Sequence, residues 1–205
     1  MHIADGILSA PVLIGGGVVA AGGTAVGLKK MDMDKIPRVA VLTAAFFVAS
    51  LIHIPLGPTN LHLILNGLVG LLLGWACFPA ILIGLLLQSL IFGFGGLTVL
   101  GVNTVNMATP AIIVYLVFNR FIRGNRRIIS IICAALAGVF GVLLASLLTA
   151  FSLVFSGEEY INIAKIVVVG HIPLMAVEGV VNVAIIMLLR KVKPEVLEVP
   201  HAVYE

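Results

Sequence analysis

Long apolar stretches, separated by charged residues or by clusters of Gly, Pro and Asn, fill almost the whole of this 205-residue chain. A helix needs roughly 20 residues to cross the hydrocarbon core of a bilayer. Charged residues make up only 10% of the chain and the mean hydropathy is +1.22, which excludes the charged surface of a soluble domain. The pattern predicts an all-α, polytopic transmembrane bundle of about seven spans, at residues 10–28, 37–54, 62–78, 79–97, 108–122, 128–155 and 163–189.

The third and fourth predicted spans are contiguous through Cys77-Phe78-Pro79. We divide them at Pro79 because proline tends to end or kink a helix, and because their combined length far exceeds one bilayer crossing. On this reading residues 1–205 form one integral membrane domain, with no room for a soluble catalytic domain.

The basic residues fall in three clusters that seven spans place on one side of the membrane. Because Lys and Arg accumulate in short cytoplasmic loops, this side is predicted to be cytoplasmic, with the N-terminus outside and the C-terminus inside. Only Lys165 is left on the outer side. The clusters are Lys29, Lys30, Lys35 and Arg38, then Arg120, Arg123, Arg126 and Arg127, then Arg190, Lys191 and Lys193.

This arrangement predicts a multi-pass protein of a prokaryotic inner membrane, and it excludes nucleic acid as the reason for the basic pI. The first six residues carry an acid and no base, unlike the start of a cleaved signal peptide, so we expect the mature chain to begin at Met1. Both cysteines lie in apolar stretches and are read as small buried side chains.

Three uncharged, turn-rich segments meet on the predicted outer side: the N-terminus, residues 54–61 and residues 93–107. They are too apolar for free loops, so we expect them to fold inward over a site, since irregular backbone at membrane depth must be buried in protein or line a cavity. Histidine is the commonest transition-metal ligand and is costly in lipid. Four of the five histidines fall on this side: His2, His53, His62 and His171.

The opening Met1-His2 can chelate a metal through three nitrogens: the free amine, the His2 amide and the His2 imidazole Nδ1. Those three nitrogens lie in one plane and leave one equatorial position, which a distant imidazole can fill. Such geometry suits Ni²⁺ and Cu²⁺ and disfavours Zn²⁺, Mg²⁺ and Ca²⁺. By itself the dipeptide is a weak signal, because it arises often by chance.

The chain resembles the NikM/CbiM family, the substrate-capturing membrane components of energy-coupling-factor nickel and cobalt transporters. The resemblance covers nearly the whole chain. It rests on three segments: Met1-His2-Ile3-Ala4-Asp5-Gly6-Ile7-Leu8-Ser9, Thr59-Asn60-Leu61-His62-Leu63 followed by Gly67-Leu68-Val69-Gly70, and Gly95-Gly96-Leu97-Thr98 leading to Gly101-Val102-Asn103-Thr104-Val105-Asn106-Met107. Ala4 stands where the family usually has Pro, which removes no ligand.

The resemblance implies that Met1 and His2 supply three nitrogen ligands and His62 the fourth, with residues 1–9 inserted into the bundle. His53 is the rival fourth ligand, although capping or packing at the end of the second span is a sufficient explanation for it. The remaining polar residues of these segments are read as groups that orient the ligands or as plain turn residues. They are Asp5, Asn60, Asn103 and Asn106.

Three polar residues of the seventh span, His171, Glu178 and Asn182, share one helical face. A carboxyl inside a membrane is a functional candidate, and a structural role in joining helices is an equal alternative. Small residues four apart in the first span, such as Gly23 and Gly27, allow another helix to approach closely, within the chain or in a partner.

The chain lacks a phosphate-binding loop and the zinc-protease and hydrolase motifs, so it is not expected to be an enzyme. Uphill metal import needs an energy source that the chain lacks, and the resemblance implies separate ATPase subunits, a membrane coupling subunit and a small companion membrane subunit. No cofactor is expected, and Ni²⁺ or Co²⁺ is the transported substrate. A stand-alone secondary transporter or channel for divalent metals is the alternative, and it predicts polar groups at all depths.

Overall fold

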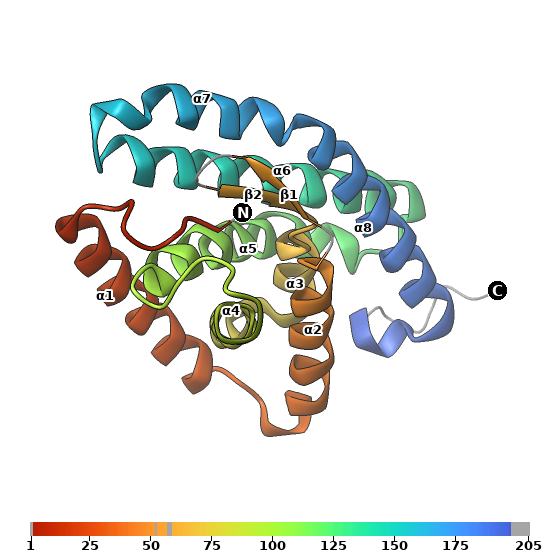
Figure 1. Ribbon diagram of the computed structural model, residues 1–205. Helices are drawn as coiled ribbons and strands as arrows, with labels where there is room; N and C mark the ends of the chain where they lie inside the picture. The colour runs from red at the N-terminus through yellow and green to blue at the C-terminus, as the bar shows by residue number, and fades with distance from the viewer. Residues whose placement is uncertain (1, 52, 57–58, 198–205) are drawn as a thin grey trace.

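The computed structural model describes residues 2–51, 53–56 and 59–197, with backbone only for residues 53–56 and 59–61 (Figure 1). Eight α-helices surround one small β-hairpin within this part of the chain. The helices are α1 (Ala10–Lys29), α2 (Ile36–Ala49), α3 (Asn66–Leu73), α4 (Cys77–Phe92), α5 (Leu100–Ile122), α6 (Arg127–Val154), α7 (Ile161–Gly170) and α8 (Ile172–Val192). The hairpin joins β1 (His53–Leu56) to β2 (Thr59–His62), and four 3₁₀ turns are η1 (Met33–Lys35), η2 (Gly74–Ala76), η3 (Glu158–Tyr160) and η4 (Pro194–Leu197).

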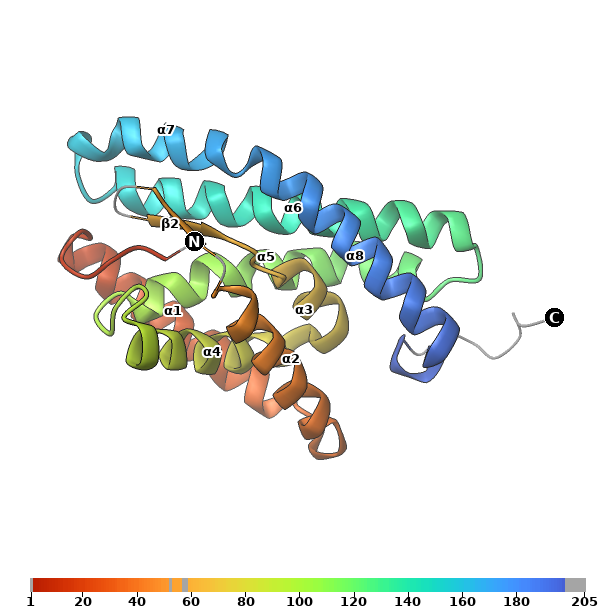
Figure 2. The same ribbon diagram turned by 45° about the vertical axis from the view of Figure 1, so that its right-hand side comes forward.

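Helix α5 lies at the centre, and the other helices can be oriented by their contacts with it. α1 runs in the same direction, because Gly16 approaches Val102 near the start of α5, whereas Lys30 shares a cavity with Arg123 beyond its end. α6 runs the opposite way, since Ser130 bonds to the carbonyl of Ile122 at the far end of α5. Figures 1 and 2 show α6 lying between α5 and the α7–α8 pair.

The chain reverses direction between α3 and α4. Asn66 at the start of α3 bonds to the carbonyl of Met107, and Gly74 just after α3 lies against Tyr115. Beyond α4, Gly95 is back beside Asn103. The turn occurs at Gly74, whose φ of 55° belongs to the left-handed region that glycine adopts without strain.

The division of this region at Pro79 is therefore wrong by a few residues. Pro79 lies in the first turn of α4, where its missing N–H would have no helical partner in any case. Gly74 makes the break instead, and a Cβ there would meet the Tyr115 ring at 3.1 Å.

Five segments of the described chain are long and apolar enough to cross a membrane: Ala10–Lys29, Asn66–Phe92, Leu100–Ile122, Arg127–Val154 and Glu158–Val192. The difference from seven has two causes. α2 has only 14 residues, and α3, η2 and α4 together count as one long apolar helical segment by length and composition, although the chain turns at Gly74. The protein is thus a helical, multi-pass membrane protein, while the count of seven and the orientation of the termini stay predictions.

Other boundaries also differ from the predicted ones. The turn-rich segment 93–107 becomes helical at Leu100, so that Asn103 and Asn106 project from α5 and not from a loop. The predicted span 37–54 ends as a helix at Ala49, and its last two residues, His53 and Ile54, belong to the strand β1. The predicted span 163–189 breaks at His171, where Pro173 begins α8.

The three basic clusters lie together at the end of the bundle away from the hairpin. Arg190 of α8 donates to the carbonyls of Ile122 (2.6 Å) and Gly124 (3.0 Å), and it also bonds to Ser130. Lys30 and Arg123 line one cavity at this end. The charge pattern that predicted the topology is therefore matched by the packing of the helices.

Glycines allow α3 to pack directly on the backbones of α5 and α6. A Cβ at Gly70 would come within 2.1 Å of the Ala111 carbonyl oxygen, and one at Gly67 within 2.4 Å of the Ala137 carbonyl oxygen. Gly15 on the exposed face of α1 has nothing within 4 Å of the same position. The close approach of α3 to α5 and α6 thus requires glycine at positions 67 and 70, whereas position 15 has space for a side chain.

We expect Gly70→Ala to lower the free energy of unfolding by about 1–3 kcal/mol, because the new methyl group meets a backbone oxygen that cannot move alone. Gly15→Ala should leave stability unchanged or slightly higher. Thermal unfolding of the two purified variants in the same detergent tests this. Equal midpoints for both variants would contradict the packing described for α3.

Candidate metal site

The N-terminal segment lies in the bundle, held to α5 by Asn103. The Ile3 amide donates to Asn103 Oδ1 (3.0 Å), and Asn103 Nδ2 donates to the Ile3 carbonyl (3.1 Å). Ile3 is fully buried and packs with Leu8 and Val102. This reciprocal pair satisfies both backbone groups of a residue that has no secondary structure, as burial away from water requires.

The hydrogen bonds between Ile3 and Asn103 hold the neighbouring His2 inside the bundle, where it is 2% exposed. Its ring lies 4.6 Å from the ring of His62, centroid to centroid, at an angle of 44°. Phe94 lies 6.2 Å away on the loop between α4 and α5. Residues 60 positions apart in sequence therefore bring two imidazoles into contact.

His62 ends β2 and is 4% exposed. Its Nδ1 lies 2.8 Å from the Leu63 carbonyl oxygen, and since a carbonyl can only accept, Nδ1 carries the proton. Nε2 is then left with a lone pair, which is the form in which a neutral histidine binds a metal. Burial is the main cause that lowers the pKa of His62 well below its usual value, so the ring is neutral at pH 7.

The loop after His62 is supported from α8 by Glu178. One carboxyl oxygen accepts from the amides of Ile64 (2.5 Å) and Leu65 (2.8 Å). Leu65 has φ of 53°, a strained value for a residue with a side chain, and it precedes the first turn of α3. Glu178 thereby fixes the backbone of the two residues that lie between the His62 loop and the start of α3.

Asp5 joins the N-terminal segment to the loop before α5. Its Oδ1 accepts from the Thr98 amide (3.1 Å) and from the Thr98 hydroxyl. Gly96 leaves the space, because a Cβ there would lie 2.0 Å from the Asp5 carboxyl carbon. Gly95 has φ of 77° and lies against His2 and Asn103, so both glycines are needed to close this loop over the histidine.

Four further residues were predicted to belong to the site: Asn106, His53, Asn60 and Met1. Asn106 exchanges hydrogen bonds with Ser152 of α6 at 3.3 Å and so joins two helices. His53 and Asn60 lie in the hairpin, where His53 pairs with His62 in register, and their side chains are outside the described residues. Met1 also lies outside them.

His171 is fully buried at the junction of α7 and α8, where its Nδ1 lies 2.6 Å from the Val167 carbonyl. Its Nε2 therefore also bears a lone pair, and this atom has no hydrogen-bond partner among the described residues. Asn182 lies one turn beyond Glu178 and approaches Gly67 of α3. The spacing of these residues predicted that they share one helical face, and the structure shows that all three are buried.

Within residues 2–51, 53–56 and 59–197, no three His, Cys, Asp or Glu side chains converge in a metal-binding group. Two imidazoles in contact, buried beside the start of the chain, can bind a transition metal only with further donors.

Residues 2–196 match the family described as "Cobalt uptake substrate-specific transmembrane region", CbiM. This chain belongs to the CbiM family. The match confirms the resemblance drawn from the three sequence segments, and it makes the protein a membrane component of cobalt or nickel transport.

The names of relatives in the CbiM family also refer to metal transport. A Haemophilus influenzae protein, whose name assigns it to metal transport, is 44% identical over 199 residues, covering 96% of this chain and 97% of its own. The fused nickel transport protein NikMN of Rhodobacter capsulatus is 38% identical over 165 residues, which are 73% of this chain and 46% of the fused protein. The cobalt transport protein CbiM of Clostridium tetani is 28% identical over 218 residues, covering 97% and 88% of the two chains.

Solved structures share the fold of this CbiM chain. A crystal structure of a transition metal transporter superposes with a TM-score of 0.77 at 26% identity, covering 94% of this chain and 93% of the other. A truncated transition metal transporter superposes equally well, at 25% identity over 93% and 99% of the two chains.

The sequence analysis did not identify Gly95 and Gly96 as the residues that allow the loop to close over His2. It also did not identify the contacts that Glu178 and Asn103 make. Glu178 was weighed as a functional or structural group, without its contact to the loop after His62. Asn103 was read as a ligand-orienting group or a turn residue. A helical register for residues 100–106 places Asn103 and Asn106 one turn apart, and only the structure shows that Asn103 bonds to Ile3 and Asn106 to Ser152.

We expect Asn103→Ala to weaken Ni²⁺ binding at least tenfold, because it leaves the Ile3 backbone unpaired and releases the segment that carries His2. Asn106→Ala, one turn along the same helix, should change affinity less than threefold. Isothermal titration of both purified variants measures the difference. A tenfold loss in both, or in neither, would contradict the anchoring role of Asn103.

We expect Glu178→Ala to lower the free energy of unfolding by about 2–4 kcal/mol, since two buried amides lose their acceptor. Glu178→Gln keeps an oxygen acceptor and should retain most of both stability and Ni²⁺ affinity. The comparison combines thermal unfolding with the visible spectrum of bound Ni²⁺. A Glu178→Ala protein that matches the unaltered protein in both would show that the carboxyl does not support the His62 loop.

Proposed function

We propose that this CbiM-family chain is the substrate-capture component of an ATP-driven, energy-coupling-factor type importer of Ni²⁺ or Co²⁺. The ion would be held by four nitrogens in a plane: the Met1 amine, the His2 amide, the His2 imidazole and the His62 imidazole. The observation that carries the proposal is the contact of the buried His2 and His62 rings.

The ring separation fits such a site. Two imidazoles at neighbouring corners of a square, each with its nitrogen about 2 Å from the metal, have centroids roughly 4.5 Å apart. The observed separation is 4.6 Å. The hydrogen bond that fixes the protonated nitrogen of His62 also leaves Nε2 as its donor.

Four nitrogen donors in a plane favour Ni²⁺, and they exclude ions that require oxygen ligands. The amine and the amide must lose protons on binding, so affinity falls in acid. His53 is a weaker candidate for the fourth position, because the residue paired with it in the hairpin, His62, already contacts the His2 ring.

Import against a gradient needs energy that this chain has no motif to provide. We therefore assign ATP hydrolysis to partner ATPase subunits, coupled through a membrane subunit, with a small companion membrane subunit in the complex. Residues 1–205 would act as one domain of the cytoplasmic membrane, with the metal site on the outer side and the basic clusters inside. Release of the ion then requires a change that separates the N-terminal segment from His62.

We expect two residues added before Met1 to abolish tight Ni²⁺ binding, because the amine would move away from the His2 imidazole. His62→Ala should weaken binding at least a hundredfold, since one of four ligands is lost. His53→Ala is the matched control and should keep affinity within about threefold. The measurement is Ni²⁺ titration of purified proteins whose thermal unfolding shows that they are folded.

Unchanged affinity in the extended protein would contradict the N-terminal chelate. Uptake assays in cells with and without the ATPase partners test the transport assignment. Full uptake in their absence would favour a stand-alone secondary transporter.

A further inference from the structure

Three polar residues on one face of α8 are fully buried: His171, Glu178 and Asn182, each 0% exposed. The contacts described above use one atom of two of them, because His171 Nδ1 bonds to the Val167 carbonyl and Glu178 Oε1 accepts from two backbone amides. Their other polar atoms are buried without a hydrogen-bond partner among the described residues: His171 Nε2, Glu178 Oε2, and Oδ1 and Nδ2 of Asn182. Support of the loop after β2 therefore leaves these atoms unexplained.

Such atoms are costly, because a buried polar group without a partner has lost its contact with water and gained no bond in return. Polar and ionisable residues inside a membrane are correspondingly rare, and they mark ion pathways in transport proteins. A single atom of this kind, such as Gln88 Oε1 on α4, can be a local defect of packing. Several in succession on one helical face indicate a site that takes a ligand.

The helix α8 runs alongside the segment that leads from His62 into α3, and in the same direction. Glu178 bonds to the two amides just before α3, at 2.5 and 2.8 Å. Asn182, one turn later, has its Nδ2 3.2 Å from the position that a Cβ would take at Gly67, inside α3. Later residues of α8 therefore meet later residues of this segment.

His171 begins the polar face beside His62. It precedes Glu178 by about two helical turns, and Glu178 contacts the backbone just after His62. Burial is the main cause that lowers the pKa of His62, and the charges of His2 and His171 lower it further, so His171 lies within electrostatic reach of His62. The Nε2 atom of His171 therefore adds a nitrogen lone pair near the two rings in contact.

The polar face leads from this level toward the basic end of the bundle. Arg190, further along α8, bonds to the Ile122 carbonyl at that end. With a rise of about 1.5 Å per residue, Glu178 lies about 10 Å and Asn182 about 16 Å beyond His171. The face therefore spans about half of a hydrocarbon core that is roughly 30 Å thick.

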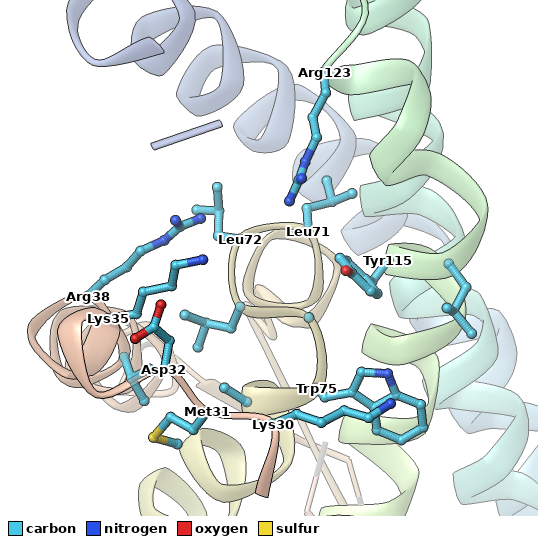
Figure 3. A pocket seen from close by; sticks show the side chains of 15 residues that line it. Lys30, Met31, Asp32, Lys35, Arg38, Leu71, Leu72, Trp75, Tyr115 and Arg123 are labelled. Carbon is cyan, nitrogen blue, oxygen red and sulfur yellow. The ribbon is translucent and has the colours of Figure 1, made fainter. Parts of the chain in front are cut away.

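An apolar layer closes the face beyond Asn182. The next buried residue of α8 is Ile186, which packs in one cluster with Leu68 of α3. The same cluster contains Leu71 and Leu72, which line the cavity at the basic end (Figure 3). The polar face is thus a site inside the bundle and not a continuous channel.

The unpartnered atoms are of the kinds that bind Ni²⁺ and Co²⁺. Imidazole nitrogen and carboxylate or amide oxygen are all ligands of divalent first-row metals. A mixture of nitrogen and oxygen donors suits these ions less well than the four nitrogens of the proposed chelate. Since an ion in transit must be bound weakly enough to leave again, this chemistry suits an ion that has already left the chelate.

We propose that His171, Glu178 and Asn182 form a second metal site, which receives the ion when the N-terminal segment releases it. The proposal rests on the function proposed above, because the ion first has to be held by His2 and His62. When that chelate opens, His171 Nε2 and Glu178 Oε2 are the next donors on the inward side, and Asn182 Oδ1 follows one turn further on. The ion then remains behind the apolar layer until the transporter opens this layer.

A purely structural role is the competing explanation, in which only the bonds to Val167 and to the two amides matter. Substitutions can separate the two roles. His171→Asn places an amide nitrogen near the position of Nδ1, which keeps the bond to Val167 and removes the lone pair of Nε2. His171→Gln places an amide oxygen near the position of Nε2 and gives up the bond to Val167. Glu178→Gln keeps an oxygen for the two amides and removes Oε2 as a carboxylate ligand.

The experiment measures uptake of radioactive Ni²⁺ by cells that contain the full-length protein with its partner subunits, and the Ni²⁺ affinity of each purified variant. We expect Glu178→Gln and His171→Asn to lower the maximal uptake rate at least tenfold, while equilibrium affinity stays within threefold. His171→Gln should keep at least a third of the rate. Gln88→Leu removes an unpartnered buried oxygen from another helix, and as the control it should change rate and affinity less than twofold.

Full uptake with either Glu178→Gln or His171→Asn would overturn the second site. A rate that His171→Asn keeps and His171→Gln loses would assign His171 to its bond with Val167, with the same consequence. A tenfold loss of affinity in Glu178→Gln or His171→Asn would place that residue in the first site and also overturn the proposal. The function proposed above is tested separately, by Ni²⁺ binding to the N-terminally extended protein and by uptake without the ATPase partners.

Discussion

The pairing of Asn103 with the Ile3 backbone is the interaction on which the site depends. A chain terminus normally frays, because it has few contacts and an unpaired backbone. Here a single amide side chain in the first turn of α5 satisfies both backbone groups of Ile3 and draws the segment into the bundle. His2 is buried as a direct result, and its ring meets His62.

Irregular backbone deep in a membrane protein requires a polar partner for every amide. Three side chains meet this need around the site: Asn103 for the N-terminal segment, Asp5 for the loop before α5, and Glu178 for the loop after His62. They come from distant parts of the sequence. The same groups that allow the loops to exist therefore also fix the two imidazoles, so that structural and functional roles coincide.

The long apolar stretches predicted the helical, membrane-spanning class, and the clusters of basic residues predicted which helix ends lie together. His2 and His62 were expected to share a site, and the structure brings their rings into contact. The sequence could not show the backbone conformation at single residues or the contacts between residues far apart in the chain. The break at Gly74 depends on a left-handed backbone, and the extent of α5 depends on Asn103 and Asn106 bonding to distant groups and not to their own backbone. The role of Glu178 depends on a contact between residues more than 110 positions apart.

X-ray absorption spectroscopy of the Ni²⁺-loaded, full-length protein tests the site most directly, because it reports the type, number and arrangement of ligands without a crystal. A buried chelate of two imidazoles and main-chain nitrogens predicts a four-coordinate, planar spectrum with nitrogen neighbours only and the scattering pattern of two imidazole rings. A six-coordinate spectrum with oxygen neighbours, or the pattern of one imidazole only, would contradict it.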